Sequence, residues 1–166
     1  TGLKYGDVIF DSDIDNWKEN DSVFDNRIKG RKQLVFIIED DQNEKFGYYF
    51  NGTITIIDGS FMKAEGSFLF SLKSNGRVNG MYKFEIQSNN AQYACYLCNK
   101  SNSYLIAFGG PSWNIRLDTQ NYKSSSYAGQ YTNSYNYHNT TNAFIPNSMS
   151  KQTNFTPKRI TVIQMK

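Results

Sequence analysis

Histidine is almost absent from this sequence of 166 residues, because His138 is the only one. A Ser-His-Asp triad or a metal site built on several histidines is therefore excluded. No nucleophile motif occurs anywhere in the chain, so we expect His138 to be an exposed or hydrogen-bonded loop residue. The alternative is a lone acid or base. The sequence contains no recognisable catalytic site.

Cysteine is nearly as scarce, and the two that occur are Cys95 and Cys98, in Tyr-Ala-Cys-Tyr-Leu-Cys. The surrounding residues predict a strand, which sends side chains three apart to opposite faces of a sheet. A redox Cys-x-x-Cys would instead begin a helix that lowers the thiolate pKa, and no helix is predicted here. We expect two reduced cysteines in a cytoplasmic or nuclear protein. A peroxide-reactive role for Cys95 or Cys98 is the alternative.

Strong charge and long hydrophobic runs are also lacking. The net charge is +3, from 18 Lys and Arg against 15 Asp and Glu, which does not by itself indicate nucleic acid or acidic membranes. No apolar run approaches the ~20 residues that cross a bilayer, so membrane insertion is not expected. The Gly pair in Phe108–Pro111 lacks the length and the following helix of a phosphate cradle, and no cofactor is predicted.

Aromatic residues are abundant, with 12 Phe and 12 Tyr, whereas proline occurs only 3 times, and this composition favours β structure. We predict one domain over residues 1–166. Segment Asn121–Gln152 is predicted to form ordered loops around one or two short strands. Short strand-like runs separated by turn residues predict an antiparallel sandwich or barrel: Asp7–Phe10, Gln33–Ile38, Lys45–Phe50, Thr53–Ile57, Ser67–Leu72, Met81–Ile86, Tyr93–Cys98, Tyr104–Phe108, Trp113–Leu117 and Arg159–Ile163.

Two of these runs differ in their expected exposure. Leu34–Ile38 is apolar at every position, which predicts that both faces of this strand are covered, whereas Met81–Ile86 alternates as a half-exposed strand does. One helix is predicted between the strands. Ser22 can cap this short helix, which holds Phe24 and Ile28 four residues apart, and Gly30 can end it in the left-handed conformation.

The segment from Asp11 to Asn16 places the carboxylates of Asp11, Asp13 and Asp15 at alternating positions, as the start of a calcium loop does. Asn16 and Ser22 stand where such a loop needs Gly and Glu. These three aspartates are therefore candidate metal ligands, and the alternative is a turn held by Asx side chains.

Six basic residues are expected to form a solvated face. The alternative is that they bind nucleic acid together with tyrosines: Arg27, Lys29, Arg31, Lys32, Lys158 and Arg159.

Short motifs follow one another along nearly the whole chain, and their order is more specific than any one of them: Asp11–Asp15, Phe24–Gly30, Leu34–Glu39 with Phe46-Gly47, Ser67–Leu72, Tyr82–Phe84, Phe108–Gly110 with Asn114–Asp118, Ser124–Tyr127 and Phe155–Ile163. In this order they resemble the TLDc family. The matched positions are of the kind that build a core or a turn, so the resemblance supplies no catalytic residue: Phe46, Gly47, Phe70, Leu72, Gly109 and Ile160.

The resemblance implies a mostly β, two-layer antiparallel β-sandwich with a few short flanking helices, and a role in protection against oxidative stress. It also implies that a protein partner is bound, with the vacuolar-type proton-pumping ATPase as a candidate. We therefore expect a non-enzymatic protein-interaction domain. The alternatives are a peroxide-reactive protein that uses Cys95 or Cys98, and a β-sandwich module that binds calcium, sugar or nucleic acid.

Overall fold

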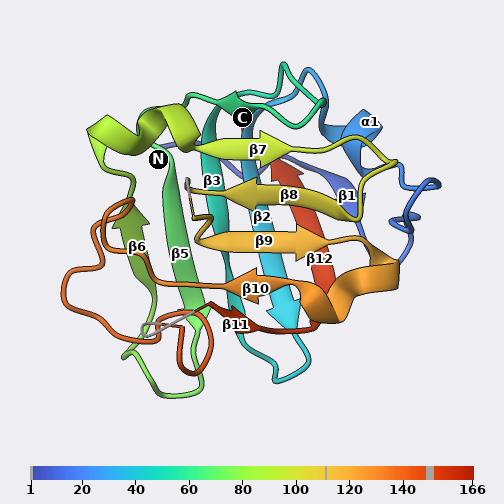
Figure 1. The fold of residues 1–166 in the computed structure, drawn as a ribbon. Coiled ribbons are helices and arrows are strands. Elements are labelled where there is room, and N and C mark those ends of the chain that lie inside the picture. The colour runs from blue at the N-terminus through green and yellow to red at the C-terminus, as the bar shows by residue number, and fades with distance from the viewer. Residues whose placement is uncertain (1, 111, 149–151) are drawn as a thin grey trace.

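The computed structural model describes residues 2–110, 112–148 and 152–166, and the predicted features at Pro111 and residues 149–151 lie outside the described residues. Within this part of the chain, strands form two antiparallel six-stranded sheets, which confirms the predicted sandwich (Figure 1). The strands of sheet A, in spatial order, are β1 (Asp7–Asp11), β12 (Pro157–Gln164), β2 (Lys32–Asp40), β3 (Lys45–Thr53), β5 (Phe68–Lys73) and β6 (Tyr82–Glu85).

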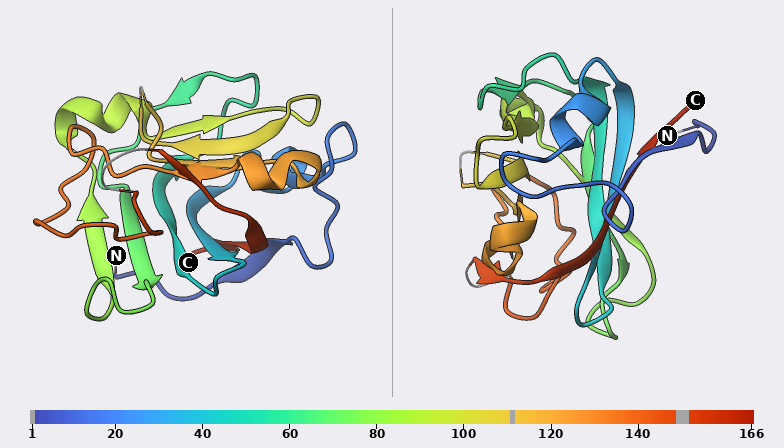
Figure 2. Two further views of the ribbon diagram at one scale, coloured as in Figure 1. Left: turned by 60° about the horizontal axis from the view of Figure 1, so that its bottom comes forward. Right: turned by 90° about the vertical axis from the view of Figure 1, so that its right-hand side faces the viewer.

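Sheet B consists of shorter strands. Its spatial order is β11 (Thr153–Asn154), β10 (Tyr127–Ala128), β9 (Ile115–Asp118), β8 (Tyr104–Phe108), β7 (Cys95–Leu97) and β4 (Phe61–Met62). The strands of sheet B cross in front of those of sheet A in Figure 1, and the edge-on view in Figure 2 separates the two layers. This crossing is typical of orthogonal sheet packing.

The core lies between the two sheets and is rich in aromatic rings. Phe36 and Tyr48 of sheet A contact Phe108 of sheet B, with ring centroids 5.0 Å and 4.3 Å apart. All three side chains are fully buried. Such aromatic pairs are worth about 0.5–1.5 kcal/mol beyond the area that they bury, so they hold the two layers together.

The predicted helix is confirmed as α1 (Phe24–Ile28), which packs beside β1. The predicted cap is wrong, because Val23 is the N-cap and no side chain caps the helix. The Ser22 hydroxyl accepts a hydrogen bond from the Phe24 N–H at 3.2 Å in the turn before it, and Gly30 has φ +75°. Two 3₁₀ helices, Ser88–Tyr93 and Gln120–Ser125, precede β7 and β10. Among the described residues, no helix is both long and apolar enough to cross a lipid bilayer.

Two predictions about strands are also wrong. Thr53–Ile57 is not a strand, because β3 ends at Thr53 and the Ile54 backbone pairs instead with Gly30 and Arg31, beyond helix α1. The run Leu34–Ile38 is not covered on both faces. Leu34, Phe36 and Ile38 are buried against sheet B, whereas Val35 and Ile37 stay half-exposed on the outer face of sheet A.

Candidate functional site

The predicted acidic turn is neutralised by two arginines. Arg159 donates to the Asp11 carboxylate from Nε at 3.1 Å and also lies 3.2 Å from Asp13, while Arg27 contacts Asp15 at 3.0 Å. The hydrogen bond from Arg159 holds the pKa of Asp11 below its usual range. Within the described residues, no three acidic, His or Cys side chains are arranged to hold a metal ion. A metal role for Asp11, Asp13 and Asp15 stays a prediction.

The same carboxylates also fold the turn. The Asp13 N–H donates to Asp11 Oδ1 at 3.1 Å, and the Asp11 N–H donates to Asp15 Oδ2 at 2.9 Å. These are the Asx interactions that the alternative reading of the sequence expects. The segment connects β1 to α1, and its carboxylates are already occupied by backbone donors and guanidinium groups.

Both cysteines are free and buried. Cys95 lies on β7 with its side chain in the core, and Cys98 follows the end of this strand. Burial raises the pKa of Cys98 to about 12 and that of Cys95 well above its usual value. Because the thiolate is the reactive form, both groups are unreactive thiols at neutral pH in this fold. A redox role for either one stays a prediction that requires local opening.

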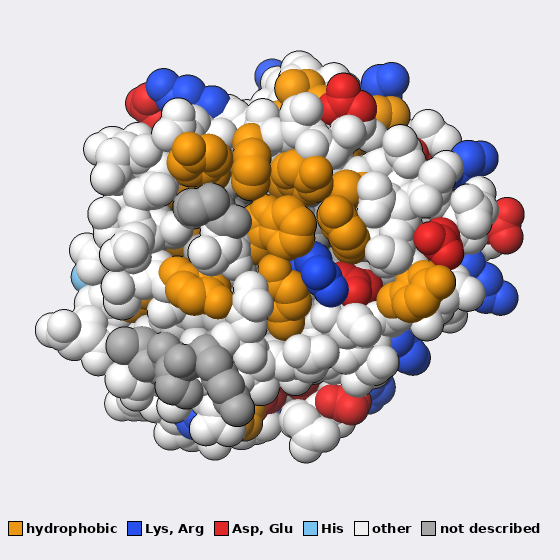
Figure 3. Space-filling view, in the orientation of Figure 1, with side chains coloured by type: hydrophobic (Ala, Val, Ile, Leu, Met, Phe, Trp, Pro, Cys, Tyr) orange, Lys and Arg blue, Asp and Glu red, His pale blue; other side chains and the backbone are white. Residues whose placement is uncertain are grey.

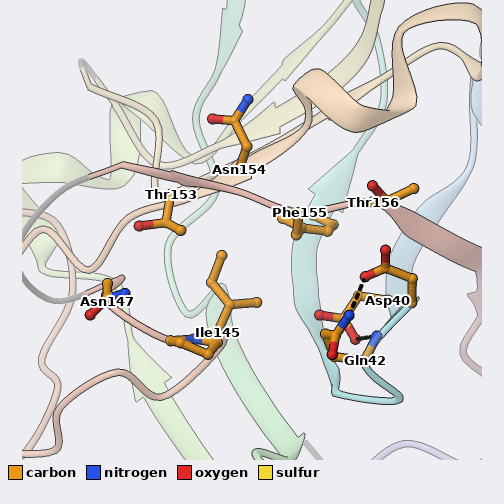
Figure 4. Close-up of a pocket in the computed structure, with 10 residues that line it drawn as sticks. Asp40, Gln42, Ile145, Asn147, Thr153, Asn154, Phe155 and Thr156 are labelled. Atoms are coloured by element: carbon orange, nitrogen blue, oxygen red, sulfur yellow. Dashed lines mark hydrogen bonds between the residues drawn. The ribbon is translucent and has the colours of Figure 1, made fainter.

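The side chain of His138 is half-exposed beside a polar hollow of about 380 Å³ and lies 3.0 Å from a Glu85 carboxylate oxygen. A second hollow of about 280 Å³, drawn in Figure 4, lies beside the turn after β2. Its Asp40 carboxylate accepts hydrogen bonds from the Gln42 and Glu44 N–H groups of its own turn, at 3.0 Å and 2.8 Å. Among the described residues, the Thr153 hydroxyl that lines this second hollow is buried without a hydrogen-bond partner.

A larger opening is the apolar groove on the outer face of sheet A, with a volume of about 460 Å³. We define the apolar groove by six of its lining residues: Val35, Ile37, Phe68, Leu72, Met81 and Lys83. They come from β2, β5, β6 and the residue before β6. Met81 is 76% exposed, and the Lys83 ammonium lies 4.6 Å from the Phe68 ring centroid.

Glycine shapes the floor of this groove. Gly47 on β3 pairs with Ile37 on one side and Phe70 on the other, and it faces outward between them. The tip of the Phe70 ring lies 2.8 Å from the position that a Cβ of residue 47 would occupy. The Phe36 backbone oxygen would lie only 1.9 Å from the same Cβ, so a residue with a side chain does not fit at this position without a shift of the backbone.

The outer face of sheet B carries a different surface, made of aromatic rings. Strand register places five residues in one line across the sheet: Phe61 pairs with Tyr96, Tyr96 with Ala107, Ala107 with Arg116, and Arg116 with Tyr127. The neighbours of these residues along the strands point into the core. Figure 3 shows hydrophobic side chains gathered on this face, around a basic and an acidic group.

Three rings from outside the line complete the surface. Tyr93 lies 5.1 Å from Phe61, and Trp113 lies 5.4 Å from Tyr96 and 5.6 Å from Tyr104, measured between ring centroids. We define the aromatic row as Phe61, Tyr93, Tyr96, Tyr104, Trp113, Arg116 and Tyr127.

Arg116 is fixed within this row. Its Nε and Nη2 donate to the two carboxylate oxygens of Asp118 at 2.6 Å and 2.8 Å, and Nη2 also reaches the Ser125 carbonyl at 3.2 Å. Its guanidinium carbon lies 4.7 Å from the Tyr127 ring centroid and 5.3 Å from that of Tyr104. Burial raises the pKa of Asp118, and the hydrogen bonds from Arg116 oppose this shift. The guanidinium plane is therefore held rigidly between two rings.

Sequence reasoning found neither surface. The alternation in Met81–Ile86 indicated one open wall of the apolar groove, but the apolar run in β2 indicated coverage. The aromatic row depends on register between strands, and Phe61 lies on a two-residue strand that was not predicted. Tyr96 and Arg116, alternating with buried neighbours, were the signal available in the sequence.

Comparison with known families identifies one match that covers nearly the whole chain. A family model, described as the TLDc domain, matches residues 9–165. This range includes all twelve strands except the first two residues of β1. A comparison with curated proteins finds no match.

Proposed function

Because the chain belongs to the TLDc domain family, which is associated with oxidation-resistance proteins, we propose that it is a non-enzymatic protein-interaction domain that supports resistance to oxidative stress. The observation that carries this proposal is the apolar groove on sheet A. Contiguous exposed apolar surface is unfavourable in water and marks interaction sites. The groove is open and contains Lys83 as its one charged side chain, so it suits protein side chains better than a polar metabolite.

The proposed partner is a subunit of the vacuolar-type proton-pumping ATPase, bound in the cytoplasm. The family resemblance supports this choice of partner, and the groove supplies the surface. Apolar side chains of the partner would fill this groove. The Lys83 ammonium, which pairs with Glu85 at 3.3 Å, would lie at its rim.

The test changes the groove without disturbing the core. In the double variant Leu72→Glu/Met81→Glu, two exposed apolar side chains become anionic, and both lie at the groove. The control is Ile14→Glu, which places one glutamate charge outside the groove, on a residue that is 84% exposed in the acidic turn. Binding of the purified cytosolic sector of the proton pump is measured by biolayer interferometry.

The wild type and Ile14→Glu are expected to bind equally, and the double variant at least tenfold more weakly, as for loss of central apolar anchors. Absence of wild-type binding to the pump would contradict the proposed partner. Equal binding by the double variant would exclude the apolar groove as the binding surface. Binding of the wild type to lipid vesicles, lost in the double variant, would replace the protein partner by a membrane.

A further inference from the structure

The rings of the aromatic row are already held in place. Phe61 packs edge-on against Tyr93 and Tyr96, and Trp113 packs against Tyr96 and Tyr104. Each of these rings is half-buried, so part of each one faces solvent. A ligand that contacts them loses little side-chain entropy, because the side chains have already been ordered by the fold.

The dimensions of the row suit a short extended peptide. From Phe61 on β4 to Tyr127 on β10 the row spans five adjacent strands, or ~19 Å at the usual strand spacing. Tyr127 is 8% exposed, so its ring closes the row at this end behind Arg116. A polyproline II helix rises ~3.1 Å per residue, so about six residues cover this distance. Neighbouring ring centroids at Tyr96 lie 5.0–5.4 Å apart. Twice this spacing is comparable to one polyproline II turn of ~9.3 Å.

The charged group of the row is a donor, and its tyrosine hydroxyls can donate or accept. Within the described residues, Nη1 of Arg116 has no hydrogen-bond partner, while the other nitrogens of its guanidinium are occupied. Asp118, the carboxylate in contact with the row, is 2% exposed and accepts from Arg116 with both oxygens. The row therefore offers ring faces, tyrosine hydroxyls and a guanidinium N–H, but no free carboxylate within it.

This chemistry distinguishes between classes of ligand. Sugars need acceptors for their many hydroxyl groups, and single-stranded nucleic acid needs unpaired cations beside the rings, whereas the charge of Arg116 is neutralised by Asp118. A proline-rich segment presents apolar rings and carbonyl acceptors, and its prolines lack N–H donors. We propose that the aromatic row docks a proline-rich segment of a partner protein in the polyproline II conformation, with its carbonyl groups facing Arg116 and the tyrosine hydroxyls.

One end of the row carries a negative charge. Asp58 is exposed just before β4. The next residue, Gly59, lies against Tyr96, because a Cβ at Gly59 would be 2.9 Å from the Tyr96 hydroxyl oxygen. Asp58 is therefore close to the row. A basic residue at the corresponding end of the peptide would pair with Asp58 and set the direction in which the peptide binds.

The experiment titrates the protein into a fluorescein-labelled peptide of about six prolines, the length that covers the row, preceded by one arginine. Anisotropy is recorded, together with acrylamide quenching of tryptophan emission. Trp113 belongs to the row, whereas Trp17 is 4% exposed and serves as an internal reference. The variants are Trp113→Ala and Tyr96→Ala. Tyr122→Ala, at a tyrosine that is 45% exposed outside the row, is the matched control.

Saturable binding is expected for the wild type and Tyr122→Ala, with at least tenfold weaker binding for the other two variants. In the wild type, the peptide should also protect the emission of Trp113 from quenching, a readout that does not depend on whether a variant folds. An alanine peptide with the same arginine should not bind. Equal affinity in all variants, or no saturation at millimolar protein, would overturn the proposal.

Cellohexaose and oligo(dT) are tested in parallel. Binding of either one with the same variant dependence, in the absence of peptide binding, would assign the row to sugar or nucleic acid instead. Leu72→Glu/Met81→Glu should leave peptide binding unchanged, because these residues line the apolar groove of sheet A. Failure of this inference is thus distinguishable from failure of the proposed function.

Discussion

Replacement of Arg77 by methionine is expected to destabilise the protein strongly, because Arg77 neutralises a buried carboxylate. The Glu44 side chain is 1% exposed, and Arg77 Nη1 forms an ion pair with its Oε1. The same guanidinium donates to the carbonyl groups of Asn142 and Phe144, at 2.8 Å and 2.9 Å. One side chain thereby joins the turn after β5 to the loop that places Phe144 in the core.

The magnitude follows from the desolvation of Glu44. Removal of one partner from a buried ion pair costs about 3–5 kcal/mol, since the remaining charge stays buried and uncompensated. For a chain of this size, each kcal/mol lowers the melting temperature by about 2–4 °C, which gives a decrease of about 6–20 °C. In Arg77→Met/Glu44→Gln the buried charge is gone. We expect the double variant to regain about 2 kcal/mol relative to Arg77→Met.

Urea unfolding followed by tryptophan emission and circular dichroism measures these differences. The control is Arg31→Met, which removes an exposed hydrogen bond of 3.2 Å to Gln164 and should cost less than about 1 kcal/mol. A cost below about 1 kcal/mol for Arg77→Met would refute the reasoning. Strict additivity of the two changes in the double variant would refute it as well, because it would mean that the charges are not coupled.

Three further predictions concern Asp11, the two cysteines and Gly109. Asp11→Asn should lower the free energy of unfolding at neutral pH, because the ion pair with Arg159 is lost. The difference from wild type, measured by urea unfolding, should shrink as the pH falls below about 3.9 and should vanish below the lowered pKa of Asp11, where the wild-type carboxyl is protonated as well. Native protein should react slowly with Ellman's reagent, because burial raises the pKa of both thiols. The variant Cys95→Ser/Cys98→Ser should protect cells from peroxide as well as the wild type does. Loss of protection in this variant would favour a redox role. Gly109→Ala should lower stability by about 2–4 kcal/mol in thermal melts, because φ is +72° and two side-chain atoms lie 2.6 Å from the new Cβ.

Much of the fold could be predicted from local patterns. Alternation and β propensity locate β2, β5 and β12 to within a few residues, and Phe24 and Ile28 four apart before Gly30 locate helix α1. The strand predicted over Thr53–Ile57 is wrong although its β-branched residues have high strand propensity. The Ile54 backbone forms hydrogen bonds with Gly30 and Arg31 and so leaves the sheet.

The surfaces were harder to predict than the elements. The apolar run in β2 is compatible with a covered face or an open one, and only the complete sheet shows that Val35 and Ile37 line the apolar groove. The aromatic row requires residues from β4 to β10 to align, and register between strands distant in sequence is not encoded locally. The acidic turn and the two cysteines have conspicuous sequence patterns, yet the structure occupies the former with arginines and buries the latter.

The position of β12 in sheet A has a consequence for synthesis of the chain. This last strand lies between β1 and β2 and pairs with both, so the sheet bridges a sequence separation of more than a hundred residues. During translation, the edge of β2 that faces β12 stays without its partner until residues 157–164 have left the ribosome. Until then, that edge is available for pairing with another nascent chain. This edge of β2 is therefore covered only once β12 has been synthesised.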